Sequence, residues 1–168
     1  MFDFLKSSCH YKEVNRIFKL IFAIIICEGV GILGSVFTIS QIPVWYVSLN
    51  KPIFSPPNWI FGPVWIVLYA LMGISIVLAL EKSAKKNKHF IYKIFGIQLF
   101  LNFLWTVIFF GIHETRLAFI EIIVLWVSIL YLIIIFNKIS KVASYLLIPY
   151  LLWVSFAALL NFWIAILN

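Results

Sequence analysis

Amide and aromatic side chains recur at helical spacing in three apolar stretches of the sequence. In residues 90–112, Gln98, Asn102 and Trp105 are separated by four and three positions, which places them on one face of a helix. Two interpretations of this face are open. The amides can hydrogen-bond to neighbouring helices of a bundle, or they can form the polar wall of a ligand cavity between helices.

Two further stretches carry related faces, which lie in residues 143–167 and 59–80. Their side chains are Tyr150, Trp153, Ala157 and Asn161 in the first stretch, and Trp65, Tyr69 and Met72 in the second. Each face alone is typical of ordinary packing. Together, three faces that combine Trp with an amide, a hydroxyl or a thioether favour an aromatic pocket that has a few polar groups.

Glu28 is an ionisable residue in the middle of the apolar stretch 17–39. An acid at such a depth is a candidate functional residue, and the alternative is a protonated carboxyl group bonded to another helix. Cys27, Gly31 and Ser35 form a face of small residues beside it. Such a face suits close helix contact, either within a bundle or across a dimer.

The sequence offers no set of side chains typical of metal binding or nucleophilic catalysis. The cysteines, Cys9 and Cys27, have no metal-ligand spacing, and His10, His89 and His113 lie in the tail or in connections, where we interpret them as solvated. No Ser, His and Asp combination and no Gly-rich loop accompanies them. We therefore expect no metal, no obligatory cofactor and no conventional catalytic residue.

The composition indicates which solvent surrounds these faces. Hydrophobic residues make up 64% of the chain and charged residues 11%, whereas about a quarter of the residues of soluble domains are charged. Apolar runs of roughly 20 residues cross a bilayer as helices, because lipid leaves backbone groups no other partner. We predict one all-α membrane domain over residues 1–168, surrounded by lipid. Its five transmembrane helices cover about 17–39, 59–80, 90–112, 117–137 and 143–167, with a proline-rich lid loop over 40–58.

The net charge of +7 would suggest a nucleic-acid partner in a soluble protein, but its distribution indicates membrane orientation instead. Eleven of the thirteen Lys and Arg residues fall before the first helix or in the second and fourth connections, and only Lys51 and Arg116 fall on the other side. The positive-inside rule then predicts a cytoplasmic N-terminus, and a lid and C-terminus outside the membrane. We expect a multi-pass protein of a bacterial cytoplasmic membrane that binds no nucleic acid.

The segment WYVSLNKPIFSPPNWIFGPVWIVLYALMG, which begins at Trp45, closely resembles the signature of the TspO/translocator protein family. The family comprises the tryptophan-rich sensory proteins, also called peripheral benzodiazepine receptors. The later blocks LNFLW, FFG and LLIPYLLWVSFAALLN agree with the same pattern. The resemblance implies a five-helix bundle, often a homodimer, with a cavity open toward the first connection. In the family this cavity binds porphyrins such as protoporphyrin IX and haem, and isoquinoline or benzodiazepine-type drugs.

The resemblance also assigns residues to the cavity. Trp65 and Trp153 would form its aromatic walls, Tyr46 would come from the loop, Asn102 from the third helix, and Ala157 from the floor. The whole candidate ligand-binding set is Trp45, Tyr46, Lys51, Pro56, Pro57, Trp59, Trp65, Tyr69, Gln98, Asn102, Trp105, Tyr150, Trp153, Ala157 and Asn161.

The lid itself combines prolines, interfacial aromatic rings and one cation. Pro56 and Pro57 fix the backbone, so the lid loses little entropy when it encloses a ligand. Trp45, Tyr46 and Trp59 suit an interfacial aromatic belt as well as a flat ligand. Lys51 is the cation that could pair with a porphyrin propionate.

We therefore expect a membrane receptor or transporter-like protein that binds tetrapyrroles, as a sensor or scavenger. Two alternatives stay open: a light- and oxygen-dependent porphyrin-degrading enzyme in which Trp65 and Trp153 take part in redox chemistry, and a transporter of another hydrophobic small molecule. Vertebrate members carry a cholesterol-recognition pattern that needs a basic residue near the C-terminus. Here no Lys or Arg follows Lys141, so cholesterol transport is not expected.

Overall fold

The computed structural model describes residues 2–168, and side chains from Val14 onward. The side chains of Lys6, Cys9, His10 and Lys12 therefore lie outside the described part of the chain. The elements in chain order are α1 (Phe2–Gln41), η1 (Ile42–Tyr46), η2 (Asn58–Ile60), α2 (Phe61–Lys82), η3 (Lys85–Asn87), α3 (Lys88–Thr106), η4 (Val107–Gly111), α4 (Thr115–Ile139), α5 (Lys141–Tyr145) and α6 (Ile148–Leu167). The described residues contain helices and no strands.

Five of these helical segments are long and apolar enough to cross a membrane. They are Val14–Tyr46, Asn58–Lys82, Lys85–Gly111, Thr115–Ile139 and Lys141–Leu167. The predicted all-α membrane bundle of five spans is confirmed, and each predicted span overlaps one of these segments. The reason is the one used for the prediction: an apolar run of this length satisfies its own backbone only as a helix.

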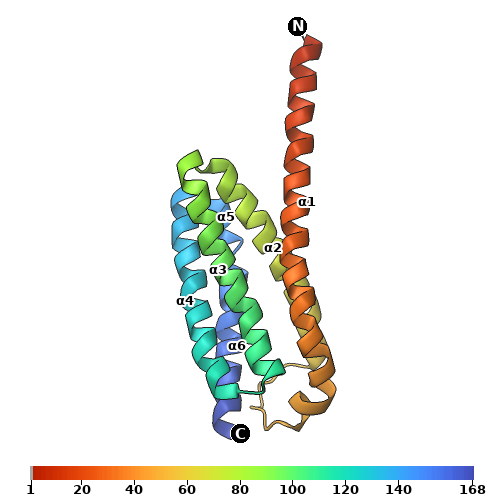
Figure 1. The fold of residues 1–168 in the computed structure, drawn as a ribbon, viewed down its shortest axis with the longest axis vertical. Coiled ribbons are helices and arrows are strands. Elements are labelled where there is room, and N and C mark those ends of the chain that lie inside the picture. The colour runs from red at the N-terminus through yellow and green to blue at the C-terminus, as the bar shows by residue number, and fades with distance from the viewer. Residues whose placement is uncertain (1) are drawn as a thin grey trace.

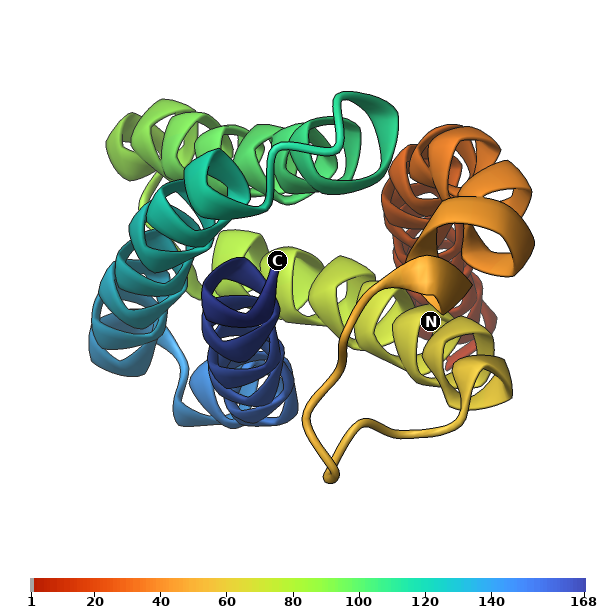
Figure 2. The ribbon, with the colours of Figure 1, turned by 90° about the horizontal axis from the view of Figure 1, so that it is seen from below.

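Successive spans run antiparallel, and α1 stands at one side of the bundle. α1 packs against α2 and α3, whereas α4 packs against α3, α5 and α6 (Figures 1 and 2). The N-terminal part of α1 extends beyond the other helices (Figure 1). The same end of the bundle carries the α2–α3 connection and the α4–α5 turn, and the basic residues in or directly beside them are Lys82, Lys85, Lys86, Lys88, Lys138 and Lys141. The side of the membrane that this end faces stays a prediction.

The contact between α1 and α2 depends on two glycines. A Cβ atom on Gly73 of α2 would lie 2.8 Å from the backbone of Ile24, and Gly31 of α1 lies directly against the ring of Tyr69. Cys27, on the same face of α1, is 1% exposed. The small-residue face therefore serves a close contact within the bundle, which was one of its two predicted uses.

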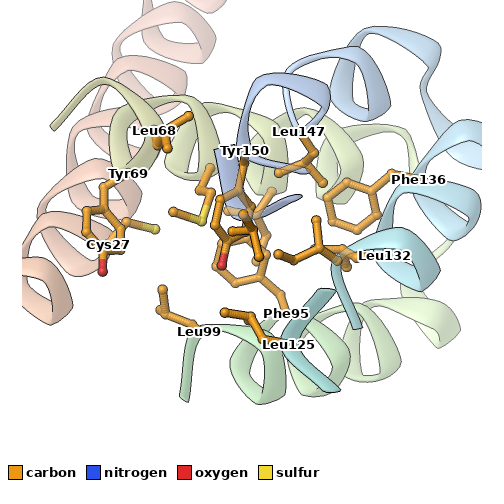
Figure 3. Packing of buried hydrophobic residues seen from close by; sticks show 14 of the residues in the cluster. Cys27, Leu68, Tyr69, Phe95, Leu99, Leu125, Leu132, Phe136, Leu147 and Tyr150 are labelled. Carbon is orange, nitrogen blue, oxygen red and sulfur yellow. The ribbon is translucent and has the colours of Figure 1, made fainter. Parts of the chain in front are cut away.

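A buried core fills the space between α2, α3, α4 and α6. Met72, Ile129, Phe136 and Tyr150 are fully buried there. Figure 3 shows Tyr150 among core side chains, between Tyr69 on one side and Leu132 and Phe136 on the other. The same cluster includes Cys27 of α1, so the core joins all five spans.

Two prolines affect the course of the helices, and neither of them simply marks the end of a helix. Pro43 lies inside the π-helical turn η1, which continues α1 to Tyr46, and the next two residues are also helical. A π turn accommodates the missing proline N–H without ending the helix. The extended lid is therefore confined to residues 49–57, shorter than the predicted 40–58, and the prediction that Tyr46 comes from the loop is wrong. Pro149 lies in the first turn of α6, directly after the break that separates α5 from α6.

Candidate functional site

A cavity of about 360 Å³ lies between α1, α2, the α3–η4 segment and α6. Its size falls in the range of small-molecule sites. At one end it is bordered by Tyr46 and Asn58, on either side of the lid, and at the other end by Glu28 and Tyr69. Of the predicted site residues, those that line it are Tyr46, Trp65, Tyr69, Trp105, Trp153, Ala157 and Asn161.

Tryptophans from three different helices form the walls of this cavity. Trp65 of α2 lies 5.4 Å from the ring of Tyr69, centroid to centroid, and Trp153 of α6 lies 6.1 Å from Phe61. Trp105 of α3 stacks on Phe109 at 5.1 Å with an interplanar angle of 18°. Trp153 meets Phe61 edge-on and Trp105 is stacked, both geometries that such pairs prefer, whereas Trp65 is tilted by 32° against Tyr69. The cavity therefore presents flat apolar surfaces with fixed orientations.

Asn102 lies behind this wall and joins three helices. Its Oδ1 accepts a hydrogen bond from the Tyr69 hydroxyl, and its Nδ2 donates to the Tyr150 hydroxyl at 2.9 Å. Asn102 and Tyr150 are almost completely buried, and neither borders the cavity. They fix the orientation of Tyr69, which does border it.

Gln98 also packs between helices and does not line the cavity. Its Nε2 lies 3.8 Å from the Met72 sulfur, a weak contact, and its side chain is fully buried. For Gln98 and Asn102 the structure thus favours bonding between helices over the polar cavity wall. The prediction required direct contact between the ligand and Gln98, Asn102 and Tyr150. None of these three side chains borders the cavity, so they are not placed to make that contact.

Trp105 and Asn161 form a second polar link, and both line the cavity. The Trp105 indole N–H donates to Asn161 Oδ1 at 3.1 Å, and Asn161 Nδ2 donates to the Thr115 carbonyl at 2.8 Å. Asn161 thus ties α3 and the start of α4 to α6. Ala157, one turn earlier on α6, leaves room in front of these groups.

The lid residues lie around the mouth of the cavity instead of on its walls. Lys51 Nζ donates to the Tyr46 carbonyl at 2.8 Å and lies 4.5 Å from the centre of the Tyr46 ring. Pro56, Pro57 and Trp59 do not line the cavity, and Trp59 is 73% exposed. The bond from Lys51 therefore closes the lid onto the end of the first span.

Trp45 faces away from the cavity and toward the α3–α4 connection. Its ring stacks on His113 at 4.2 Å with an interplanar angle of 17°, and it meets Phe109 edge-on at 5.3 Å. His113 Nε2 is also 3.1 Å from Gln41 Oε1. The interpretation of His113 as merely solvated is therefore wrong: it is exposed, but it holds the end of α1 against the next connection.

Sequence reasoning missed several residues that the structure singles out. Phe61 and Asn58 line the cavity just before Trp65. Their position in the sequence, between the lid and this tryptophan, could have identified them as cavity residues. Glu121 is 7% exposed in α4, and neither carboxyl oxygen has a hydrogen-bond partner. Glu28 is a candidate because it is an acidic residue in an apolar span, and the same criterion identifies Glu121. Among the side chains from Val14 onward, no three His, Cys, Asp or Glu residues gather as a metal site would require.

Comparison with known proteins gives a consistent result over nearly the whole chain. Residues 23–167 match the model of the TspO/MBR family. The tryptophan-rich protein TspO of Chlorobaculum tepidum is 41% identical over 155 residues, which cover 92% of this chain and 98% of the relative. The protein of the same name from Archaeoglobus fulgidus is also 41% identical, over 91% of this chain and 99% of its own length.

A more distant relative comes from an animal. The translocator protein of Ovis aries is 33% identical over 134 residues, 79% of each chain. The five apolar spans make this chain a multi-pass integral membrane protein, and the relatives from Chlorobaculum and Archaeoglobus are consistent with a cytoplasmic membrane. Because the family match and the identities extend from α1 to α6, the chain belongs to the TspO/MBR family.

Proposed function

We propose that this protein binds porphyrins such as protoporphyrin IX and haem, and isoquinoline or benzodiazepine-type ligands, in the cavity between α1, α2, α3 and α6. Membership of the TspO/MBR family supports a membrane sensor or transporter-like role. The observation that carries the finer proposal is the convergence of Trp65, Trp105 and Trp153 on one cavity.

The geometry of these rings suits a flat aromatic ligand. Indole faces gain dispersion and stacking energy from a parallel or edge-on ring, and a planar macrocycle can meet more than one face at once. Because Trp65 and Trp105 are already held by Tyr69 and Phe109, little side-chain entropy is lost on binding. Porphyrin propionates would lie at the lid end, where Lys51 is the lid cation.

Tryptophan fluorescence of the detergent-purified protein, titrated with protoporphyrin IX, tests the proposal. The variants are Trp65→Phe and Trp153→Phe, and the matched control is Trp163→Phe, on the same helix as Trp153 but not among the cavity-lining residues. We expect saturable quenching in the wild type and in the control. Both cavity variants should bind more weakly, by roughly fivefold, as expected when a stacked ring pair worth about 1 kcal/mol is lost.

Quenching that is absent, or that Trp163→Phe weakens as much as Trp153→Phe does, would contradict the proposal. Unspecific partition of the porphyrin into the micelle gives a linear, non-saturating signal in every variant. A competition titration with an isoquinoline carboxamide extends the test to the second ligand class. It should displace the porphyrin if both share the cavity.

A further inference from the structure

Glu28 places a carboxyl group at one end of the cavity, and the proposed porphyrin ligands do not explain its presence there. Among the described residues that line the cavity, it is the sole Asp, Glu, Lys, Arg or His side chain. It lies on α1, one turn before Gly31, which packs against the Tyr69 ring. Glu28 and Tyr69 therefore mark the end of the cavity opposite the lid.

The Glu28 carboxyl group has no partner of its own in the described part of the protein. No hydrogen bond joins it to a side chain from Val14 onward, and the ion pair recorded there connects Arg16 to Glu81 at 3.1 Å, outside the cavity. The carboxyl group is only partly buried and borders the cavity, so it is accessible to a ligand that brings a donor to this position.

The neighbouring rings select the kind of donor. Tyr69 and Trp65 line the cavity on the facing helix, and aromatic faces attract a cation through their quadrupole. A carboxylate together with aromatic faces is complementary to a protonated amine, and it is unfavourable for an anionic group. Glu28 thus lies at the end of the cavity away from Lys51, which does not line the cavity and whose Nζ bonds the Tyr46 carbonyl in the lid region.

We propose that Glu28 makes the end of the cavity away from the lid a subsite for a protonated amine or an equally strong N–H donor. Flat aromatic ligands that carry such a group bind in preference to those that lack it, and they orient with this group toward Glu28. This inference rests on the proposed function, because it assumes that the cavity accepts a flat aromatic ligand.

The test compares two probes that differ only in the donor. 9-(Aminomethyl)anthracene is protonated at neutral pH, and 9-methylanthracene has the same ring system without charge. Binding of each to the full chain in an uncharged detergent is measured by calorimetry for the wild type, for Glu28→Gln and for Glu81→Gln. The last variant removes an acid from α2 outside the cavity and serves as the matched control. Protoporphyrin IX is titrated into the same three proteins.

We expect the wild type and Glu81→Gln to bind the amine roughly tenfold more tightly than the methyl probe, a ratio that corresponds to about 1.4 kcal/mol. In Glu28→Gln this preference should disappear, while the affinity for 9-methylanthracene stays unchanged. An equal affinity for both probes in the wild type would overturn the inference, and so would a preference that survives in Glu28→Gln.

Protoporphyrin IX separates this inference from the proposed function. If 9-methylanthracene and protoporphyrin IX bind but no protein prefers the amine, the subsite is wrong and the proposed function stands. If the amine preference depends on Glu28 but protoporphyrin IX does not bind, the subsite is supported and the porphyrin ligand is wrong. If no probe binds, both proposals are wrong.

Discussion

Asn50 in the lid and Asn168 after α6 exchange hydrogen bonds. The Asn50 backbone N–H donates to Asn168 Oδ1 at 3.0 Å, and Asn168 Nδ2 donates to the Asn50 carbonyl at 3.1 Å. Lys51, the next residue, bonds the Tyr46 carbonyl at 2.8 Å. The lid is thus attached both to the end of the first span and to the end of the last one, on either side of the cavity mouth.

Replacing Asn168 by Ala should loosen the lid and leave the bundle folded. Both reciprocal bonds are lost, and each contributes about 0.5–1.5 kcal/mol net. Hydrogen exchange at the Asn50 amide should therefore accelerate by roughly tenfold, and protoporphyrin IX should associate and dissociate faster in stopped-flow quenching. Asn137→Ala, an exposed asparagine near the end of α4, is the control and should change neither rate. An unchanged exchange rate at Asn50 would mean that the bonds to Asn168 do not hold the lid.

Gly73→Ala should destabilise the contact between α1 and α2. The new Cβ atom would lie 2.8 Å from backbone atoms of Ile24, which cannot rotate away as a side chain could. We expect a loss of about 1–3 kcal/mol, typical of overpacking, seen as a lower unfolding temperature in detergent. At Gly96 nothing lies within 4 Å of the added methyl group. Gly96→Ala should therefore leave stability unchanged or raise it by up to about 1 kcal/mol, through helix propensity. Equal effects at both sites would show that α1 and α2 are not in this close contact.

The five spans could be predicted from sequence because lipid imposes one rule on every apolar run. The direction in which individual side chains point could not be predicted. Gln98, Asn102 and Trp105 share one helical face by spacing, yet only Trp105 lines the cavity. Asn102 lies at the level where α2, α3 and α6 converge and where its amide reaches Tyr69 and Tyr150. Trp105 lies one turn nearer the lid, where the cavity opens. Spacing determines the face of a helix, but not how far the neighbouring helices are from it.

Contacts between distant parts of the chain were equally beyond sequence reasoning. Trp45 resembles an interfacial or ligand-binding ring, but it stacks on His113. That contact depends on α1 continuing as a helix through Pro43, and a proline at this position ordinarily suggests that the helix ends. The π-helical turn allows the helix to continue through Pro43, but it has no periodic sequence pattern from which it could be predicted. Trp45 was consequently assigned to a loop, and His113 to solvent.

Asn102→Leu should weaken the bundle and also alter the cavity wall. Leucine has a similar size but leaves the hydroxyl groups of Tyr69 and Tyr150 without their partner, at a cost of about 1–3 kcal/mol for each buried group. The double change Asn102→Leu with Tyr69→Phe should recover part of the lost stability, because one orphaned hydroxyl is removed. Thermal unfolding of the two variants measures this coupling. A double variant less stable than Asn102→Leu alone would contradict the network.

Glu121 should respond to substitution in the opposite direction. Its carboxyl oxygens are buried in α4 and have no hydrogen-bond partner, so an apolar side chain of similar length removes an unsatisfied group instead of breaking a bond. We expect Glu121→Met to unfold at the same temperature as the wild type or at a higher one. Asn161→Leu is the contrasting variant, because Asn161 bonds both Trp105 and the Thr115 carbonyl; it should lose about 1–3 kcal/mol. A Glu121→Met protein as unstable as Asn161→Leu would show that the carboxyl group makes a bond on which the bundle depends.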